Sequence, residues 1–158
     1  MSEKREIVQA HYLNGKLHQT DGPAIVYSNG DKAYYEHGLL HREGESAIDN
    51  INGDKIWYRE GRVHRTDGPA VIFSTGEVRY YLDGLLHRVD GPAIIYPNGE
   101  EMWYFLGKIH REKNAAVKYA SGQRMFYLNG RLVKRTKSKK EKRDYRLDLK
   151  NGYITLVK

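Results

Sequence analysis

The chain contains no cysteine among its 158 residues. Without thiols, it can form neither a disulfide framework nor a zinc site held by thiolates. It also lacks any apolar run near the roughly 18 residues that a membrane span needs, and its first residues lead into no apolar stretch of signal-peptide length. These absences predict a soluble protein of the cytoplasm.

Net charge is also lacking over most of the chain, although the whole protein carries +7. Residues 134–144 hold seven Lys or Arg and two Asp or Glu, giving +5, and residues 145–158 hold three and one, giving +2. Residues 1–133 therefore balance, with 17 basic and 17 acidic side chains. The basic charge that would suit a nucleic-acid partner belongs to the C-terminal segment.

What the sequence does have is internal repetition with a period of 23 residues and no insertion. Two glycine series, one tyrosine series and one alanine series keep this period. They are Gly15, Gly38, Gly61, Gly84, Gly107 and Gly130; Gly30, Gly53, Gly76, Gly99 and Gly122; Tyr12, Tyr35, Tyr58, Tyr81, Tyr104 and Tyr127; and Ala24, Ala47, Ala70, Ala93 and Ala116. The chain is therefore a repeat protein in which each unit packs on its neighbours.

The local chemistry of each unit predicts β-hairpins. Dipeptides such as Asn14-Gly15 and Asn29-Gly30 accept positive φ at the centre of tight turns. In the first full unit we expect one strand over Lys32–Glu36, a turn at His37-Gly38 and a return strand from Leu39. Asp-Gly-Pro then interrupts the ladder, because proline has no N–H to donate. Two glycines and a proline per unit leave no uninterrupted helical stretch.

The predicted fold class is all-β: an elongated single-sheet, solenoid-like array of five 23-residue β-hairpin repeats with a terminal capping hairpin. Residues 1–11 would form an N-terminal capping strand, 12–133 the five repeats and a half repeat, 134–144 a basic linker and 145–158 a C-terminal β-hairpin. Two strands per unit, at about 4.7–4.9 Å each, would advance the array by roughly 10 Å per unit. The N-terminal strand and the last hairpin are the candidates to cap the two sheet edges.

The segment aromatic-x-x-Gly-x-x-His and the turn Tyr96-Pro97-Asn98-Gly99 resemble membrane occupation and recognition nexus (MORN) repeats. A closer resemblance is to repeat proteins of bacteriophages and giant viruses, which carry Gly-x-x-His-Arg-x-Asp-Gly-Pro-Ala and Tyr-Pro-Asn-Gly signatures. That resemblance covers Tyr12 to Val133. It implies a hairpin-repeat fold and a viral origin, and it implies no activity, because a shared architecture is not a shared function.

The recurring His and Asp, as in His64 and Asp67, have the composition of an acid–base or metal site. Their recurrence favours a structural role, since a catalytic constellation is built once from several elements. Equivalent histidines would also lie roughly 10 Å apart, too far to share one metal ion. We expect the Asp to cap its own turn and the His to bond it or a neighbouring rung. No catalytic, cofactor-binding or metal-ligating residue is therefore predicted, and the protein is not expected to be an enzyme.

A second aromatic column precedes the tyrosine series by one residue. Because adjacent residues on a strand point to opposite faces, this column would occupy the face opposite the tyrosines. It either forms an exposed stripe for a partner or is consumed by packing between rungs. Its members are the predicted partner-binding residues Tyr34, Trp57, Tyr80, Trp103 and Phe126.

The second unit breaks the repeat pattern. Asp49 stands where other units have Val26, Ile72 and Ile95, and Asn50 replaces an aromatic residue. We include Asp49 and Asn50 among the predicted partner-binding residues. The fifth unit departs from the pattern too, at Lys113 and Lys118, and drift or end-capping is the alternative explanation for both units.

The segment 134–144 has the composition of a solvated linker, and it could also contact phosphates. No aromatic side chain is interleaved before Tyr145, so base stacking has no support there. The residues that would contact phosphates are Lys137, Lys139, Lys140, Lys142 and Arg143.

Together these features predict a non-enzymatic protein–protein interaction module. The viral resemblance suggests a phage or viral protein that binds or inhibits a host protein, such as a defence protein, in the host cytoplasm. The alternative is a nucleic-acid-associated protein that works through residues 134–144.

Overall fold

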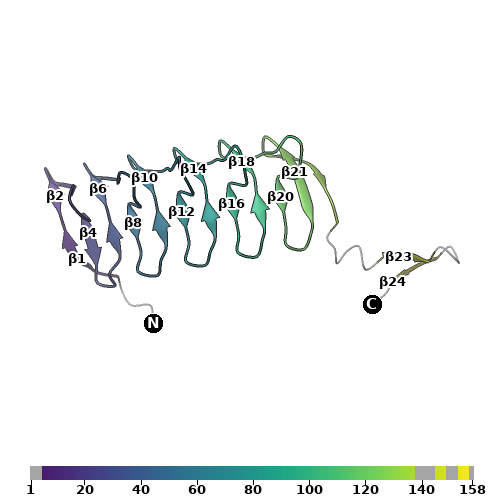
Figure 1. The fold of residues 1–158 in the computed structure, drawn as a ribbon, viewed down its shortest axis with the longest axis horizontal. Coiled ribbons are helices and arrows are strands. Elements are labelled where there is room, and N and C mark those ends of the chain that lie inside the picture. Colours follow the sequence, from purple (N-terminus) through teal and green to yellow (C-terminus); the bar gives the residue numbers. More distant parts are fainter. Residues whose placement is uncertain (1–4, 138–144, 149–152, 157–158) are drawn as a thin grey trace.

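The chain forms one long antiparallel sheet, with a row of short hairpins that follows the strand ends on one side of it (Figure 1). A computed structural model describes residues 5–137, 145–148 and 153–156. The part that it describes contains strands and turns and no helix. The predicted all-β, elongated single-sheet array is therefore confirmed.

The long sheet has 12 strands, and each of the five units contributes two of them between the first strand, β1, and the last, β22. In spatial order they are β1 (Ile7–Ala10), β4 (Ile25–Tyr27), β5 (Lys32–Ala33), β8 (Ile48–Asp49), β9 (Lys55–Ile56), β12 (Val71–Ile72), β13 (Val78–Arg79), β16 (Ile94–Ile95), β17 (Glu101–Met102), β20 (Val117–Lys118), β21 (Arg124–Leu128) and β22 (Arg131–Arg135).

Each short hairpin pairs two strands of two residues. They are β2 (Tyr12–Leu13) with β3 (Lys16–Leu17), β6 (Tyr35–Glu36) with β7 (Leu39–Leu40), β10 (Tyr58–Arg59) with β11 (Arg62–Val63), β14 (Tyr81–Leu82) with β15 (Leu85–Leu86), and β18 (Tyr104–Phe105) with β19 (Lys108–Ile109). Their turns use the predicted positive-φ residues, for example His37 at 50° and Gly38 at 87°.

The predicted continuous strand over Lys32–Glu36 is wrong, because it is interrupted at Tyr34. The N–H of Tyr34 donates to the carbonyl of Ala47, whereas its carbonyl accepts from the N–H of His41. A regular antiparallel ladder would send both bonds to one residue. Residues 42–46 therefore leave the ladder as a loop, which separates β5 in the long sheet from β6 in the hairpin.

The core is a thin line of small and aliphatic side chains. The alanine of every unit has no exposed surface, as at Ala24 and Ala70, and Ile25, Val71 and Ile94 are 4–6% exposed. No large side chain is completely buried in the part of the chain that the structure describes. Stability must therefore come from contacts between neighbouring units, as in other linear arrays.

The two ends of the sheet are closed differently. At the start, β1 pairs with β4. At the other end β22 pairs with β21 and opposes Lys134 to Phe126. Lys134 thus pairs where the other units have their alanine, and the five-residue loop that precedes this alanine in the other units is absent between Val133 and Lys134. The strand β22 therefore continues without interruption and forms the last strand of the sheet.

The final hairpin forms between β23 (Tyr145–Asp148) and β24 (Tyr153–Leu156). Within the described residues these strands pair only with each other, so the sheet edge that this hairpin was expected to cap is formed by β22 instead. No described segment forms a helix with the length and apolarity that crossing a bilayer requires.

Candidate functional site

Each ring of the second aromatic column lies against a cationic side chain. The guanidinium carbon lies 3.8 Å from the ring centroid for Arg42 on Tyr34, 4.2 Å for Arg65 on Trp57, 3.9 Å for Arg88 on Tyr80 and 4.0 Å for Arg111 on Trp103, and the Lys134 ammonium lies 5.8 Å from Phe126. Cations at these distances are attracted by the ring quadrupole. A partner would therefore meet arginine-covered rings, and intramolecular packing already uses part of the aromatic stripe.

The same arginines also hold the loops. The Nη1 of each arginine donates to the carbonyl four residues later, with distances of 3.2 Å to Ser46, 3.4 Å to Pro69, 3.3 Å to Pro92 and 3.3 Å to Ala115. One side chain thus fastens a loop to the aromatic ring beneath it. The sequence carried a signal for this role that we had missed, because an arginine follows the aromatic residue by eight positions in units two to five.

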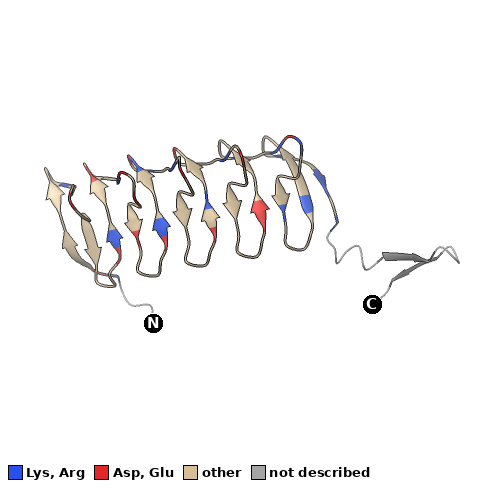
Figure 2. Ribbon diagram, viewed as in Figure 1, with Lys and Arg blue, Asp and Glu red and all other residues tan. Residues whose placement is uncertain are grey.

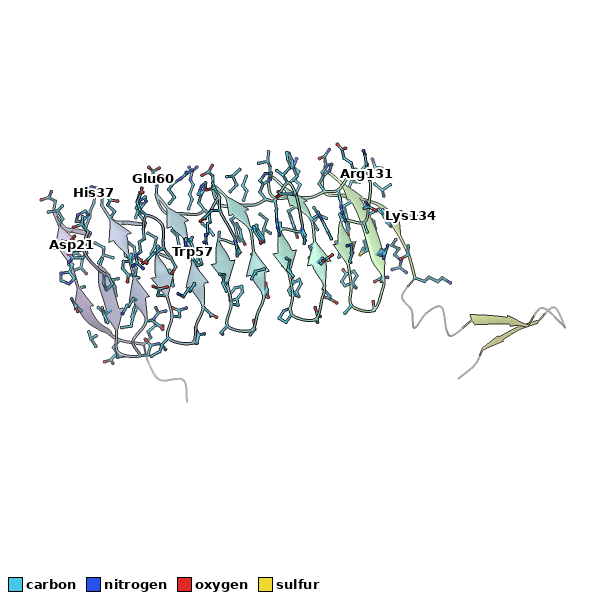
Figure 3. All side chains as sticks on the ribbon, viewed as in Figure 1. Asp21, His37, Trp57, Glu60, Arg131 and Lys134 are labelled. Carbon is cyan, nitrogen blue, oxygen red and sulfur yellow. The ribbon has the colours of Figure 1, made fainter. Side chains whose placement is uncertain are left out.

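Four depressions lie between successive loops, and each contains one ring of the column. The best example is bounded by the loops 42–46 and 65–69, with Trp57, Arg65 and Asp67 in its lining. Tyr34, Tyr80 and Trp103 line the equivalent depressions. Figure 3 labels Trp57 and the loop residue Asp21. We call this surface, made by the loops and the rings between them, the loop face.

The histidines link each unit to the next. In five units the ring Nδ1 accepts the N–H of the first turn residue in the following hairpin, which lies 19 residues later. The donors are His37 to His18, Glu60 to His41, Asp83 to His64 and Leu106 to His87, each at 3.1 Å, and Asn129 to His110 at 3.0 Å. At His64, Nδ1 also lies 2.8 Å from Oδ1 of Asp83. The expected bond from His to a neighbouring rung is confirmed.

The aspartates that follow these histidines make a different contact. Asp67 accepts from Nε of Arg65 at 2.8 Å. This hydrogen bond lowers the pKa of the Asp67 carboxyl, helped by the Asp67 backbone and by the guanidinium charge. His and Asp in one unit are thus used in separate structural bonds. Among the described residues, no group of three or more His, Asp or Glu side chains could hold a metal ion.

A second set of links, which we had not predicted, runs along the opposite turns. Asp31 accepts the N–H of Ile51 at 2.8 Å, and Asp54 accepts that of Ser74 at 2.7 Å. The Ser74 bond is the main cause of a lowered pKa at Asp54, followed by the amide of Asn52. An acidic residue follows the Asn-Gly turn in three units and the equivalent turn in one more, so this column too was visible in the sequence.

The irregular second unit has a local explanation. Asp49 contacts the hydroxyl of Ser46 and lies 3.3 Å from Nη1 of Arg42, and Arg42 also pairs with Glu45. Across the sheet, Asp49 lies between Lys32 and Lys55. Asp49 is therefore part of a charge network within its own unit, in keeping with the mixture of acidic and basic positions along the array (Figure 2).

Two buried polar atoms of the predicted site have no hydrogen-bond partner: Oδ1 of Asn50 and Nε1 of Trp57. The irregular Lys118 of the fifth unit, by contrast, pairs with Glu101 at 2.8 Å and lies 4.6 Å from the Trp103 ring centroid. With Arg111 also on this ring, Trp103 is only 8% exposed. Of the two tryptophans, Trp57 is the more accessible to a partner.

Most of the basic segment, residues 134–144, lies outside the residues that the structure describes. Lys137 is exposed at the end of the described array. Lys139, Lys140, Lys142 and Arg143 lie outside the described residues. Their predicted contact with phosphates stays a prediction.

No protein-family model matches the chain, and no curated protein matches it.

Proposed function

We propose that the protein is a non-enzymatic interaction module that binds a protein partner through the loop face. The observation that carries this proposal is the row of four depressions along the array, each with an aromatic ring and an arginine in its lining. Aromatic and arginine side chains dominate the binding energy of protein interfaces. An extended surface repeated over several units suits a partner that spans more than one unit.

The chemistry of the recurring residues supports a binding role over a catalytic one. The five linking histidines each accept a backbone N–H, so their Nδ1 lone pairs are occupied in the folded state. From the resemblance to viral repeat proteins, we propose that the chain is a phage or viral protein and that the partner is a host protein, such as a defence protein.

The test uses Val89, which is 79% exposed and lines two adjacent depressions. Partners would be captured from host extracts, identified by mass spectrometry, purified and titrated against the wild-type protein and Val89→Glu. We expect Val89→Glu to abolish binding, because it places a charge at the centre of the contact surface. The matched control is Ile51→Glu, since Ile51 is 74% exposed at the opposite turns. Equal binding by the two variants would overturn the proposed site.

The alternative function, contact with nucleic acid, is favoured by one observation: residues 134–144 carry +5 while residues 1–133 are neutral. Lys134 and Arg135 belong to β22, so deletion of residues 138–144 alone spares the sheet edge. If this segment binds nucleic acid, the deletion should weaken binding and reduce its dependence on salt. Unchanged binding after deletion would exclude residues 138–144 as the contact.

A further inference from the structure

The row of short hairpins presents a second surface whose composition differs from the rest of the array. Each hairpin has two cross-strand pairs, such as Tyr35 with Leu40 and Glu36 with Leu39. Neighbouring pairs point to opposite faces of the hairpin. In the second to fifth short hairpins the tyrosine pairs are partly buried, and burial raises the pKa of Tyr35, Tyr58 and Tyr104. The other pairs therefore form the outward face.

We call this outward face the hairpin ribbon. It has twelve positions, two from each of the five short hairpins and two from the turn end of β21 and β22. The positions are Leu13 and Lys16, Glu36 and Leu39, Arg59 and Arg62, Leu82 and Leu85, Phe105 and Lys108, and Leu128 and Arg131. Six of them are apolar, five are basic and one is acidic, and all except Leu82 are exposed.

The apolar members are unusually exposed for large side chains. The exposed fractions are 45% for Leu13, 49% for Leu39, 47% for Leu85, 46% for Phe105 and 43% for Leu128. They recur on five of the six hairpins along one edge of the array, the edge on which Figure 3 labels His37, Glu60 and Arg131. Exposed apolar side chains that recur along one side of an array favour an interaction site.

The charge of the ribbon is equally uneven. Residues 1–133 are neutral as a whole, whereas the twelve ribbon positions carry five basic side chains and one acidic side chain. Among the described residues, only one of these basic groups has an ion pair: Arg59 with Asp83, at 2.7 Å. A basic and apolar surface on a neutral body is complementary to an acidic partner that also supplies apolar side chains.

We propose that the hairpin ribbon binds an extended, acidic segment of the partner protein, with apolar side chains at intervals. This inference rests on the proposed function for the partner being a protein. Successive hairpins are about 10 Å apart, since each unit adds two strands to the sheet. A segment in the polyproline II conformation has three residues per turn and rises about 3.1 Å per residue, so side chains three residues apart lie on the same side and about 9 Å from each other. An apolar residue at every third position, separated by acidic residues, therefore matches the ribbon.

The test is a titration of fluorescent peptides followed by anisotropy. One peptide repeats Leu-Glu-Glu and the other repeats Leu-Lys-Lys, at the same length. We expect the Glu peptide to bind, more weakly at high salt, and the Lys peptide not to bind. Binding of both peptides alike, or of neither, would overturn the proposal.

Two double variants test the location of binding. Arg62→Glu with Lys108→Glu reverses two ribbon charges, and Lys55→Glu with Arg124→Glu makes the same net change on the long sheet. We expect the ribbon variant to raise the Kd for the Glu peptide about tenfold and the control to leave it unchanged. Equal effects would show attraction to overall charge and would refute the ribbon site. Leu39→Asn, compared with Ile51→Asn, tests the apolar contribution in the same way, and thermal unfolding confirms that each variant is folded.

Further measurements separate this inference from the proposed function. If the partner is lost on Val89→Glu but retained by the ribbon variant, the inference fails and the proposed function stands. If the ribbon variant loses both the peptide and the partner while Val89→Glu retains them, the inference stands and the loop face is the wrong site. Binding of wild-type protein to anionic vesicles, with the same loss in the ribbon variant and no binding of the Glu peptide, would overturn the inference in favour of a membrane surface.

Discussion

His64 provides the most direct test of how the units are held together. Its side chain is 7% exposed, and its Nδ1 accepts the N–H of Asp83 from the next hairpin. His64→Ala leaves that N–H without its acceptor, at a cost of about 1–3 kcal/mol. Loss of ring packing adds about 1–2 kcal/mol, at the low end of core truncations because the site borders solvent. We expect the free energy of unfolding to fall by about 2–5 kcal/mol.

The protein's two tryptophans allow this loss to be located. Trp57 precedes the His64 link and Trp103 follows it, so single-tryptophan proteins made with Trp57→Phe or Trp103→Phe report on the two sides. In urea titrations we expect the two fluorescence midpoints to separate further when His64→Ala is present, since a weakened link reduces coupling in a linear array.

Two companion variants make the result interpretable. His64→Asn places an amide oxygen near the position of Nδ1 and should recover part of the stability. His37→Asn changes an exposed histidine whose ring is 69% exposed, at a φ of 50° that Asn tolerates, and should have little effect. A loss below about 1 kcal/mol for His64→Ala, or an equal loss for His37→Asn, would refute the linking role of His64.

Three other outcomes follow from the turns and the partly buried tyrosines. Leu106 has a φ of 45°, which is unfavourable for a branched side chain, so Leu106→Asn should raise stability by about 0.5–1 kcal/mol in chemical denaturation. The pKa of Asp54 is lowered in the folded state, so its bond to Ser74 contributes stability at neutral pH, and this stability is lost as the pH falls through the folded pKa. Asp54→Asn should therefore reduce the loss of stability at acid pH, measured as unfolding free energy against pH. The pKa of Tyr58 is raised by burial, so its contribution is complete below about pH 10 and is lost as the pH rises through the folded pKa, and Tyr58→Phe should reduce the alkaline loss.

Much of the fold could be predicted from the sequence because its determinants are local. The Asn-Gly and His-Gly turns, the β-rich runs beside them and the strict period together indicate hairpins and their order. The bond from each histidine to a neighbouring rung was also expected. What could not be predicted is the position at which a strand is interrupted. The backbone of Tyr34 bonds to both His41 and Ala47, and this pairing depends on the loop 42–46 that lies between them.

The sequence singles out the second aromatic column, but not the contacts that its rings make. Alternation along a strand predicts that this column lies opposite the tyrosines, but the strand on which that prediction depends is interrupted at Tyr34. The covering of its rings by arginines depends on contacts made through loops, as for Arg65 on Trp57. Asp49 illustrates the same limit, since its irregularity is explained by Arg42 and Ser46 only after the loop is in place.

The neighbour-to-neighbour links of the array have an evolutionary consequence. Each histidine bond spans 19 residues and each acidic link about 20, so no described link of these two kinds reaches beyond the adjacent unit. An in-frame duplication or loss of one 23-residue unit would therefore preserve every junction while changing the length of the array by about 10 Å. The gene can adjust the number of contacts offered to a partner in whole steps, and with it the avidity, without redesigning any single contact.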